Sequence, residues 1–154
     1  MKQQFLSKSD IKKLVEDLQN QGITIAFSKK DPLKVIDDTF YYKGNDLYFF
    51  VNELAGSKQF VPSLKILQTM DLLPEVIVDM GAIKFIVNGA DIMRPGIVSC
   101  SSFAKGSFVA IKDETHKKTI AVGFCAMDSD ELMAQTKGIV VKNIHYVGDE
   151  IWNR

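Results

Sequence analysis

The stretch from residue 80 to residue 98, MGAIKFIVNGADIMRPGIV, carries the side chains best suited to binding a ligand. A short amphipathic run stops at Asn88-Gly89, and the chain turns again at Arg94-Pro95-Gly96. Glycine adopts backbone angles that let a ligand approach closely, and arginine binds phosphate bidentately or stacks on a base. The pattern predicts a helix, a tight glycine loop and a strand, with Lys84, Asn88 and Arg94 near one rim.

The cationic and aromatic candidates each have a structural alternative. Lys84 could simply extend along the wall of the barrel, and Arg94 could pair with Asp91. Lys105, which precedes a glycine, could extend a cationic patch or be an ordinary surface lysine. His145-Tyr146 and Trp152 resemble a platform for stacking bases, although a tryptophan so placed also closes a barrel as a core residue.

Motifs for catalysis and for metal binding are missing from the sequence. It contains no GxGxxG, no GxxxxGK[ST] and no GxSxG. The acidic pairs Asp37-Asp38, Asp113-Glu114 and Asp149-Glu150 are adjacent in sequence, which favours solvated turns over two carboxylates facing one substrate. Cys100 and Cys125 form no CxxC pair, so we expect two buried, inert thiols and no metal site. These observations predict a protein without enzymatic activity and without a cofactor.

The composition excludes several classes of protein. Nineteen basic residues balance nineteen acidic ones, so the chain does not coat nucleic acid nonspecifically. A hydrophobic content of 46% is typical of a globular protein. No apolar run approaches the roughly 20 residues that cross a bilayer, and the N-terminus lacks a secretory signal. We therefore expect a cytoplasmic protein that does not associate with membranes.

The first half of the chain reads as mixed helix and strand. Apolar spacing predicts a helix that is capped by Ser7 or Ser9 and ends at Gly22, followed by a strand over 23–27. A hairpin is predicted from 40–43 and 47–51, and a helix from 62 to 70. The hairpin aromatics occupy both faces, so they either pack in a core or dock a partner protein; they include Tyr41, Tyr42, Phe49 and Phe50.

From Glu75 onward, the sequence pattern differs from that of the first half. Short β-branched runs alternate with glycine and polar residues, which is typical of a small barrel. These runs cover residues 76–78, 97–100, 108–112, 119–124 and 138–142. A weak helix or turn is predicted over 129–135. We place the domain boundary near residues 73–75, which gives domains of residues 1–74 and 75–154.

Three segments of the second half together resemble a PUA domain. They are VIVDMGAIKFIVNGADIMRPGI (76–97), AVGFCAMDSDEL (121–132) and KGIVVKNIHYVGDEIW (137–152). They are most similar to the PUA domain of the malignant T-cell amplified sequence protein family of translation factors. The first half resembles the pre-PUA domain of the same family. The resemblance implies an α+β fold, in which a mixed α/β pre-PUA domain precedes a PUA β pseudo-barrel.

The resemblance also implies a non-enzymatic RNA-binding protein of the translation apparatus. Its ligand would be structured RNA, either tRNA or rRNA, and its partner a ribosomal subunit or another translation factor, in initiation or recycling. The implied RNA-binding surface consists of Lys84, Asn88, Gly89, Ala90, Asp91, Met93 and Arg94, and Lys105 is our addition to it. Two alternatives remain, a protein–protein adaptor and an accessory subunit of an RNA-modifying enzyme.

Overall fold

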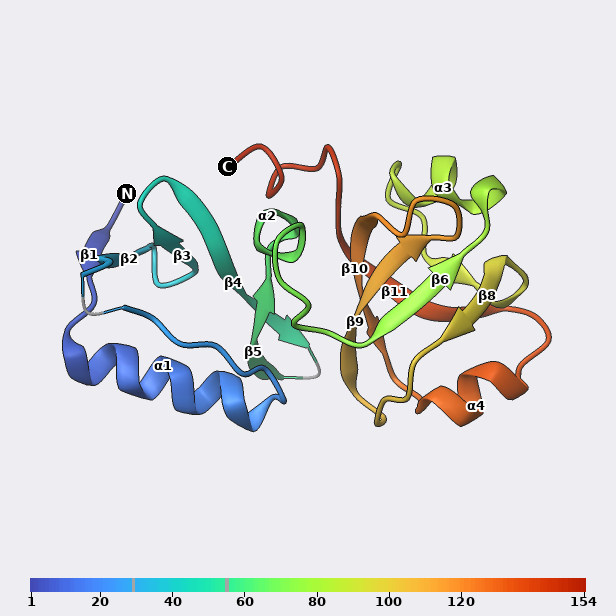
Figure 1. Ribbon diagram of the computed structural model, residues 1–154, viewed down its shortest axis with the longest axis horizontal. Coiled ribbons are helices and arrows are strands. Elements are labelled where there is room, and N and C mark those ends of the chain that lie inside the picture. The colour runs from blue at the N-terminus through green and yellow to red at the C-terminus, as the bar shows by residue number, and fades with distance from the viewer. Residues whose placement is uncertain (29, 55) are drawn as a thin grey trace. The chain divides into compact units, whose positions relative to one another are not determined.

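The computed structural model describes residues 1–28, 30–54 and 56–154 (Figure 1). The chain divides into two compact units, Met1–Ile66 and Leu67–Arg154. Each unit is built around a sheet of its own, so the α+β class that the sequence predicted is confirmed. None of the helices in the described part of the chain is long and apolar enough to cross a membrane.

The N-terminal unit is a five-stranded antiparallel sheet with one long helix. The strands follow chain order across the sheet. They are β1 (Gln3–Phe5), β2 (Leu33–Ile36), β3 (Phe40–Lys43), β4 (Asp46–Leu54) and β5 (Ser57–Pro62). Helix α1 (Lys8–Asn20) starts with a capping box between Ser7 and Asp10, and it buries Leu14 and Leu18. The predicted cap and the predicted hairpin are both confirmed.

Half of the aromatic side chains of the β3–β4 hairpin are fully buried, and the others are partly buried. Tyr42, Phe49 and Phe50 are buried, and the ring of Tyr41 packs edge-on against Phe60 with 5.4 Å between the centroids. The structure therefore favours the core interpretation of these residues over docking of a partner protein.

Two predicted elements of this half are corrected. Residues 23–27 form no strand, because the apolar Ile23 is buried by a turn in which its amide donates to the Leu18 carbonyl. The helix predicted over 62–70 is only α2 (Leu64–Leu67), because Pro62 still pairs with Phe49 as the last residue of β5. Apolar patterning signals burial, and it does not specify which backbone pairing achieves it.

The C-terminal unit contains a six-stranded sheet with the order β7-β11-β10-β9-β6-β8. Its strands are β6 (Glu75–Val78), β7 (Ile92–Met93), β8 (Ile97–Cys100), β9 (Ser107–Asp113), β10 (Thr119–Cys125) and β11 (Ile139–Tyr146). The neighbours β6 and β9 are parallel, and the other described pairs are antiparallel. The five predicted strand runs of this half are confirmed, and β11 continues four residues beyond the predicted 142 to Tyr146.

The two edge strands of this sheet are neighbours in the chain. Only the single 3-10 turn η1 (Arg94–Gly96) separates β7 from β8, which draws the two edges together into a nearly closed barrel. Helix α3 (Met80–Ile86) follows β6, and α4 (Ser129–Ala134) follows β10. The barrel interior is a single apolar cluster that includes Val76, Ile111 and Val141. Ile86 of α3 and Ile92 of β7 belong to this cluster, so both elements are anchored in the barrel core.

Candidate functional site

Helix α3 is short, and side chains and backbone close both of its ends. At its start, the Asp79 carboxylate accepts a hydrogen bond from the Ala82 amide at 2.9 Å. At its end, the amides of Gly89 and Ala90 donate to the carbonyls of Ile86 and Phe85, both at 3.0 Å. This is a Schellman closure, and Gly89 supplies its left-handed residue with φ of +94°. The glycine loop, residues 87–91, therefore serves first of all to close the C-terminal end of α3.

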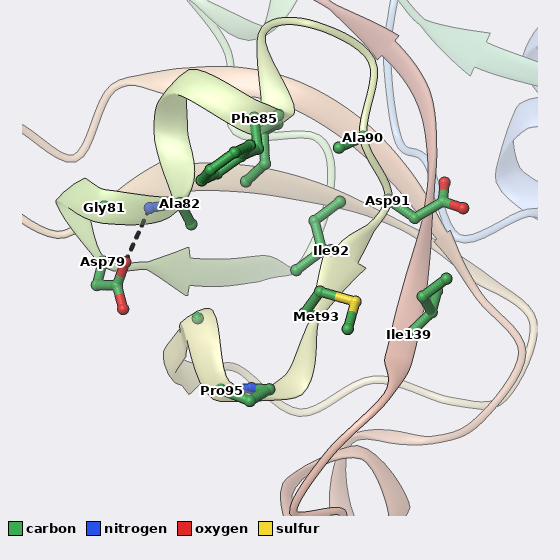
Figure 2. A pocket seen from close by; sticks show the side chains of 12 residues that line it. Asp79, Gly81, Ala82, Phe85, Ala90, Asp91, Ile92, Met93, Pro95 and Ile139 are labelled. Atoms are coloured by element: carbon green, nitrogen blue, oxygen red, sulfur yellow. Dashed lines mark hydrogen bonds between the residues drawn. The ribbon is translucent and has the colours of Figure 1, made fainter.

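A groove of about 530 Å³ lies between α3 on one side and β7 with η1 on the other (Figure 2). Its lining is mainly apolar and includes Ala82, Ile86, Ile92 and Pro95. Among the described residues that line it there is no lysine or arginine, and its charged groups are the carboxylates of Asp79 and Asp91. Its walls therefore suit a flat, apolar or weakly polar group better than a phosphate.

Three large apolar side chains stand exposed around this groove. Phe85 on α3 is 59% exposed, Met93 on β7 is 49% exposed, and Ile139 at the start of β11 is 61% exposed. Figure 2 shows them on the two walls of the groove. An exposed apolar patch around a concave site is typical of a binding surface. We call the groove together with these three residues the α3–β7 groove.

The structure brings only part of the predicted surface to the α3–β7 groove. Ala90, Asp91 and Met93 line it. Lys84 is exposed on α3, where its ammonium lies 5.1 Å from the centre of the Phe85 ring, as in a cation–π contact. The Asn88 side chain donates to the Lys84 carbonyl at 2.6 Å and so takes part in the helix end. Lys84 therefore provides a cation beside the groove.

The structure gives Arg94 hydrogen-bond partners other than Asp91. Its guanidinium donates to the carbonyls of Ile97 at 3.1 Å and Met133 at 3.2 Å, and the side chain is partly buried. Asp91 does not pair with it; its carboxylate accepts the amide of Asn143 at 2.9 Å. Arg94 therefore ties η1 to β8 and to the end of α4. A phosphate that it bound would have to compete with these backbone acceptors.

Lys105 lies apart from the α3–β7 groove. It stands in an exposed turn before β9, where the next residue, Gly106, donates its amide to the Cys125 carbonyl. It is not one of the lining residues. The prediction that Lys105 extends the same surface has no geometric support from the groove itself.

Two residues of β11 that the sequence did not single out for this role support the glycine loop. The Asn143 side-chain amide donates to the carbonyls of Ile86 at 3.0 Å and Ala90 at 2.9 Å. A β-carbon built on Gly89 would lie 3.3 Å from both Cε1 and Oη of Tyr146. The segment KNIHY (142–146) predicts a strand end at Lys142 and a stacking platform at His145-Tyr146 and belongs to the PUA resemblance, and no local signal in it points to the glycine loop.

This support changes the expected role of the loop. Tyr146 covers one side of Gly89, and the amides of Asn88, Gly89 and Ala90 all donate to carbonyls at the end of α3. The loop therefore offers no free amide of these three residues for a phosphate. The open face of the site is the α3–β7 groove.

The predicted platform near the C-terminus is mostly interior. His145 is 1% exposed, and its Nδ1 lies 2.8 Å from Asp149 Oδ2. Burial lowers the pKa of His145 below its usual value of about 6.5, and the hydrogen bond to Asp149 partly opposes this shift. Trp152 is half-buried, and its amide donates to Asp149. His145 cannot stack on a base from this position.

The remaining chemical candidates have structural roles. Asp37 and Asp38 form a turn with positive φ at both residues. The Asp113 carboxylate accepts the amides of His116 and Lys118. Cys100 and Cys125 are free thiols; Cys125 is buried as predicted, whereas Cys100 is only partly buried because it lies at the end of the edge strand β8. The described residues contain no cluster of three or more side chains able to hold a metal ion.

The comparisons with known proteins agree with this architecture. The family model of the PUA domain matches residues 74–147. A protein of Methanocaldococcus jannaschii that is named only as uncharacterized is 39% identical over 99% of this chain and 96% of its own length. Malignant T-cell-amplified sequence 1-B of Xenopus laevis is 36% identical over 86% of this chain and 77% of its own length.

A yeast relative and two solved structures complete the comparison. Translation machinery-associated protein 20 of Saccharomyces cerevisiae is 36% identical over 62% of this chain and 57% of its own length. A PUA-domain structure from Aeropyrum pernix, solved as a tartrate complex, has a TM-score of 0.82 and 27% identity, and the match covers 98% of this chain and 89% of that one. A conserved PUA-domain protein of Thermoplasma acidophilum has a TM-score of 0.77 and 32% identity over 99% and 98%.

These matches extend over both units, and the predicted family is confirmed. The chain belongs to the family of PUA-domain proteins that includes the malignant T-cell-amplified sequence proteins.

Proposed function

We propose that this protein binds structured RNA, either tRNA or rRNA, as a non-enzymatic component of the translation apparatus. The names of its relatives support the translational role, since one of them is a translation machinery-associated protein. The observation that carries the proposal is the α3–β7 groove, an exposed apolar site within the PUA domain.

The groove is suited to unpaired bases. Sequence-specific recognition of RNA commonly uses unstacked bases that lie against aromatic or apolar side chains. Phe85, Met93 and Ile139 offer such contacts, while Lys84 stands beside Phe85 and is free to approach a neighbouring phosphate. A chain with no net charge gains little from nonspecific phosphate contacts, so bases must contribute most of the affinity.

The proposal extends to the organisation of the whole protein. Residues 75–154 form the RNA-binding domain, and residues 1–74 form the pre-PUA domain. The protein works in the cytoplasm without a cofactor, on a ribosomal subunit or with a second translation factor, in initiation or recycling. Asn88, Gly89 and Arg94 contribute by holding the loop and η1 in place, and Lys105 contributes at most a peripheral phosphate contact.

The direct test removes the apolar contacts of the groove. The double variant Phe85→Ala/Ile139→Ala is titrated against fluorescently labelled tRNA and rRNA fragments. Because stacking is worth about 1–3 kcal/mol per base, the affinity should fall roughly tenfold or more. The matched control is Val98→Ala/Met133→Ala, which shortens two exposed apolar residues that do not line the groove. Equal affinities of both double variants and the parent protein would exclude this surface.

A second titration separates the cations. Lys84→Ala should weaken binding a fewfold and lower the slope of log K against log salt by about 1, as expected for the loss of one phosphate contact. Lys105→Ala should leave both quantities nearly unchanged, because this residue does not line the groove. A larger effect at Lys105 than at Lys84 would place the RNA elsewhere on the barrel.

The exposed apolar residues also favour a second candidate function. A groove with apolar walls fits an apolar segment of a partner protein, which would make the chain an adaptor. The buried hairpin aromatics do not support that role, so the adaptor surface would be the same α3–β7 groove. Capture of partners from a lysate with and without RNase separates the two, since partners of an adaptor survive the RNase treatment.

A further inference from the structure

The chain segment after β11 is organised by one carboxylate. Asp149 Oδ2 accepts the Tyr146 amide at 2.9 Å, and Oδ1 accepts the Trp152 amide at 2.7 Å. His145 Nδ1 lies 2.8 Å from Oδ2 and 3.0 Å from Oδ1. Because an ionised carboxylate only accepts hydrogen bonds, Nδ1 carries the proton in this contact.

These contacts are protected from water. The Asp149 side chain is 13% exposed, and the His145 side chain is almost fully buried. Hydrogen bonds to an ionised group are about twice as strong as neutral ones, and a partly buried setting strengthens them further. The turn over residues 146–152 is therefore fixed more firmly than an ordinary surface turn.

The fixed turn determines where Tyr146 lies, and Tyr146 in turn packs on the glycine loop. Its amide and its carbonyl both bond to Asp149, at 2.9 Å and 3.1 Å. Its ring covers Gly89, the residue with φ of +94° that closes α3. Asn143, which lies on the same strand as Tyr146, donates to the carbonyls of Ile86 and Ala90 on either side of Gly89.

We propose that Asp149 is a positioning residue for the loop over residues 87–91, and that it acts through Tyr146. This loop forms one end of the α3–β7 groove, because Ala90 and Asp91 line the groove. The inference that Asp149 thereby affects RNA affinity rests on the proposed function. The positioning role itself concerns only the free protein.

Amide hydrogen exchange on the free, full-length protein tests the positioning role. The amides of Asn88, Gly89 and Ala90 each donate to a carbonyl at the end of α3, so they report directly on closure of the loop. In Asp149→Asn these three amides should exchange roughly tenfold faster than in the parent protein. The amides of the buried strand β9 should change by a clearly smaller factor.

The comparison with β9 separates positioning from general stability. A residue that only stabilises the whole domain would accelerate exchange in the loop and in β9 by the same factor, and that result would overturn the proposal. The matched control is Asp128→Asn, because Asp128 also accepts a backbone amide, that of Glu131 at 2.8 Å, at the start of α4. It should leave the exchange of the three loop amides unchanged.

A double-mutant cycle tests the route through Tyr146. Tyr146→Leu removes the ring from Gly89 and should accelerate exchange in the loop as Asp149→Asn does. The two substitutions combined should add little to either one alone, because they interrupt the same chain of contacts. Independent, additive effects would overturn the proposed route. Should Asp149→Asn fail to fold, Asp149→Glu, which keeps a carboxylate but displaces it from the amides of Tyr146 and Trp152, replaces it in the same cycle.

Titration of the same variants with tRNA then addresses the proposed function separately. Faster loop exchange together with an affinity about fivefold lower supports both inferences. Faster loop exchange with unchanged affinity keeps the positioning role and counts against the groove as the RNA site. Unchanged loop exchange overturns the positioning role, whatever the affinity.

Discussion

The β3–β4 hairpin and the α3–β7 groove both concentrate large apolar side chains, and they treat them in opposite ways. The hairpin buries Phe49 completely and Phe50 almost completely. The groove leaves Phe85 and Ile139 mostly exposed, although their chain neighbours Ile86 and Val140 belong to the barrel core. This difference shows that apolar content alone identifies neither a core nor a binding site. What matters is whether another element of the same unit covers the side chain.

This contrast gives the two regions different energetic roles. A buried aromatic residue stabilises the fold, whereas an exposed one contributes little to folding and leaves apolar surface available to a ligand. Substitutions in the hairpin should therefore change stability, and substitutions in the groove should change binding.

The strongest test of the comparison replaces one phenylalanine in each region. Phe49→Ala should lower the free energy of unfolding by about 3–5 kcal/mol, because it leaves a cavity in the N-terminal core. Phe85→Ala should change it by less than about 0.5–1 kcal/mol. Chemical denaturation followed by circular dichroism measures both. A comparable loss in Phe85→Ala would show that the groove wall is part of the core.

A smaller effect is expected at the glycine loop. Gly89→Ala and Gly138→Ala both force alanine into positive φ, at +94° and +88°, which costs about 1–2 kcal/mol. The new β-carbon at residue 89 also meets Tyr146, whereas the one at residue 138 meets no atom within 4 Å. Gly89→Ala should therefore be the more destabilising of the two by about 1 kcal/mol. Equal melting temperatures would mean that Tyr146 yields without cost.

The smallest expected effect is the pH dependence of stability that the buried His145 causes. Since the pKa of His145 is lowered in the folded protein, the unfolded chain takes up a proton first as the pH falls below about 6.5. Stability of the C-terminal unit should be fully present above that pH and decline through the acidic side of it. The melting temperature should drop by a few degrees between pH 7.5 and 5.5. His145→Gln should show a flatter dependence over this range.

The sequence predicted much of the local structure, because local signals carried it. Ser7 and Asp10 encode the start of α1, Gly44 lies in the hairpin turn, and the β-branched runs after residue 75 mark the barrel strands. The strand expected over 23–27 was wrong, since Ile23 is buried although residues 23–27 form no strand. Patterning reports burial, and pairing depends on which strands lie nearby.

The candidate site was predicted less completely than the fold. Of the stretch over residues 80–98 that the sequence predicts as a binding surface, Ala90, Asp91 and Met93 line the groove. Arg94 was expected to face a ligand or Asp91, yet its partners are carbonyls of Ile97 and Met133, the latter 39 residues away in the chain. Asn143 and Tyr146 reach the loop from more than 50 residues away. No local pattern contains such contacts.

The cap of α1, the hairpin turn, the neutral charge and the family could be predicted from the sequence, since each depends on residue types that are close together or counted along the chain. The folded structure was needed to show which apolar residues face water, that Lys84 is exposed beside the groove, and what holds the glycine loop. Exposure and hydrogen-bond competition depend on atoms brought together from distant segments, as Asp149 and Tyr146 are at Gly89.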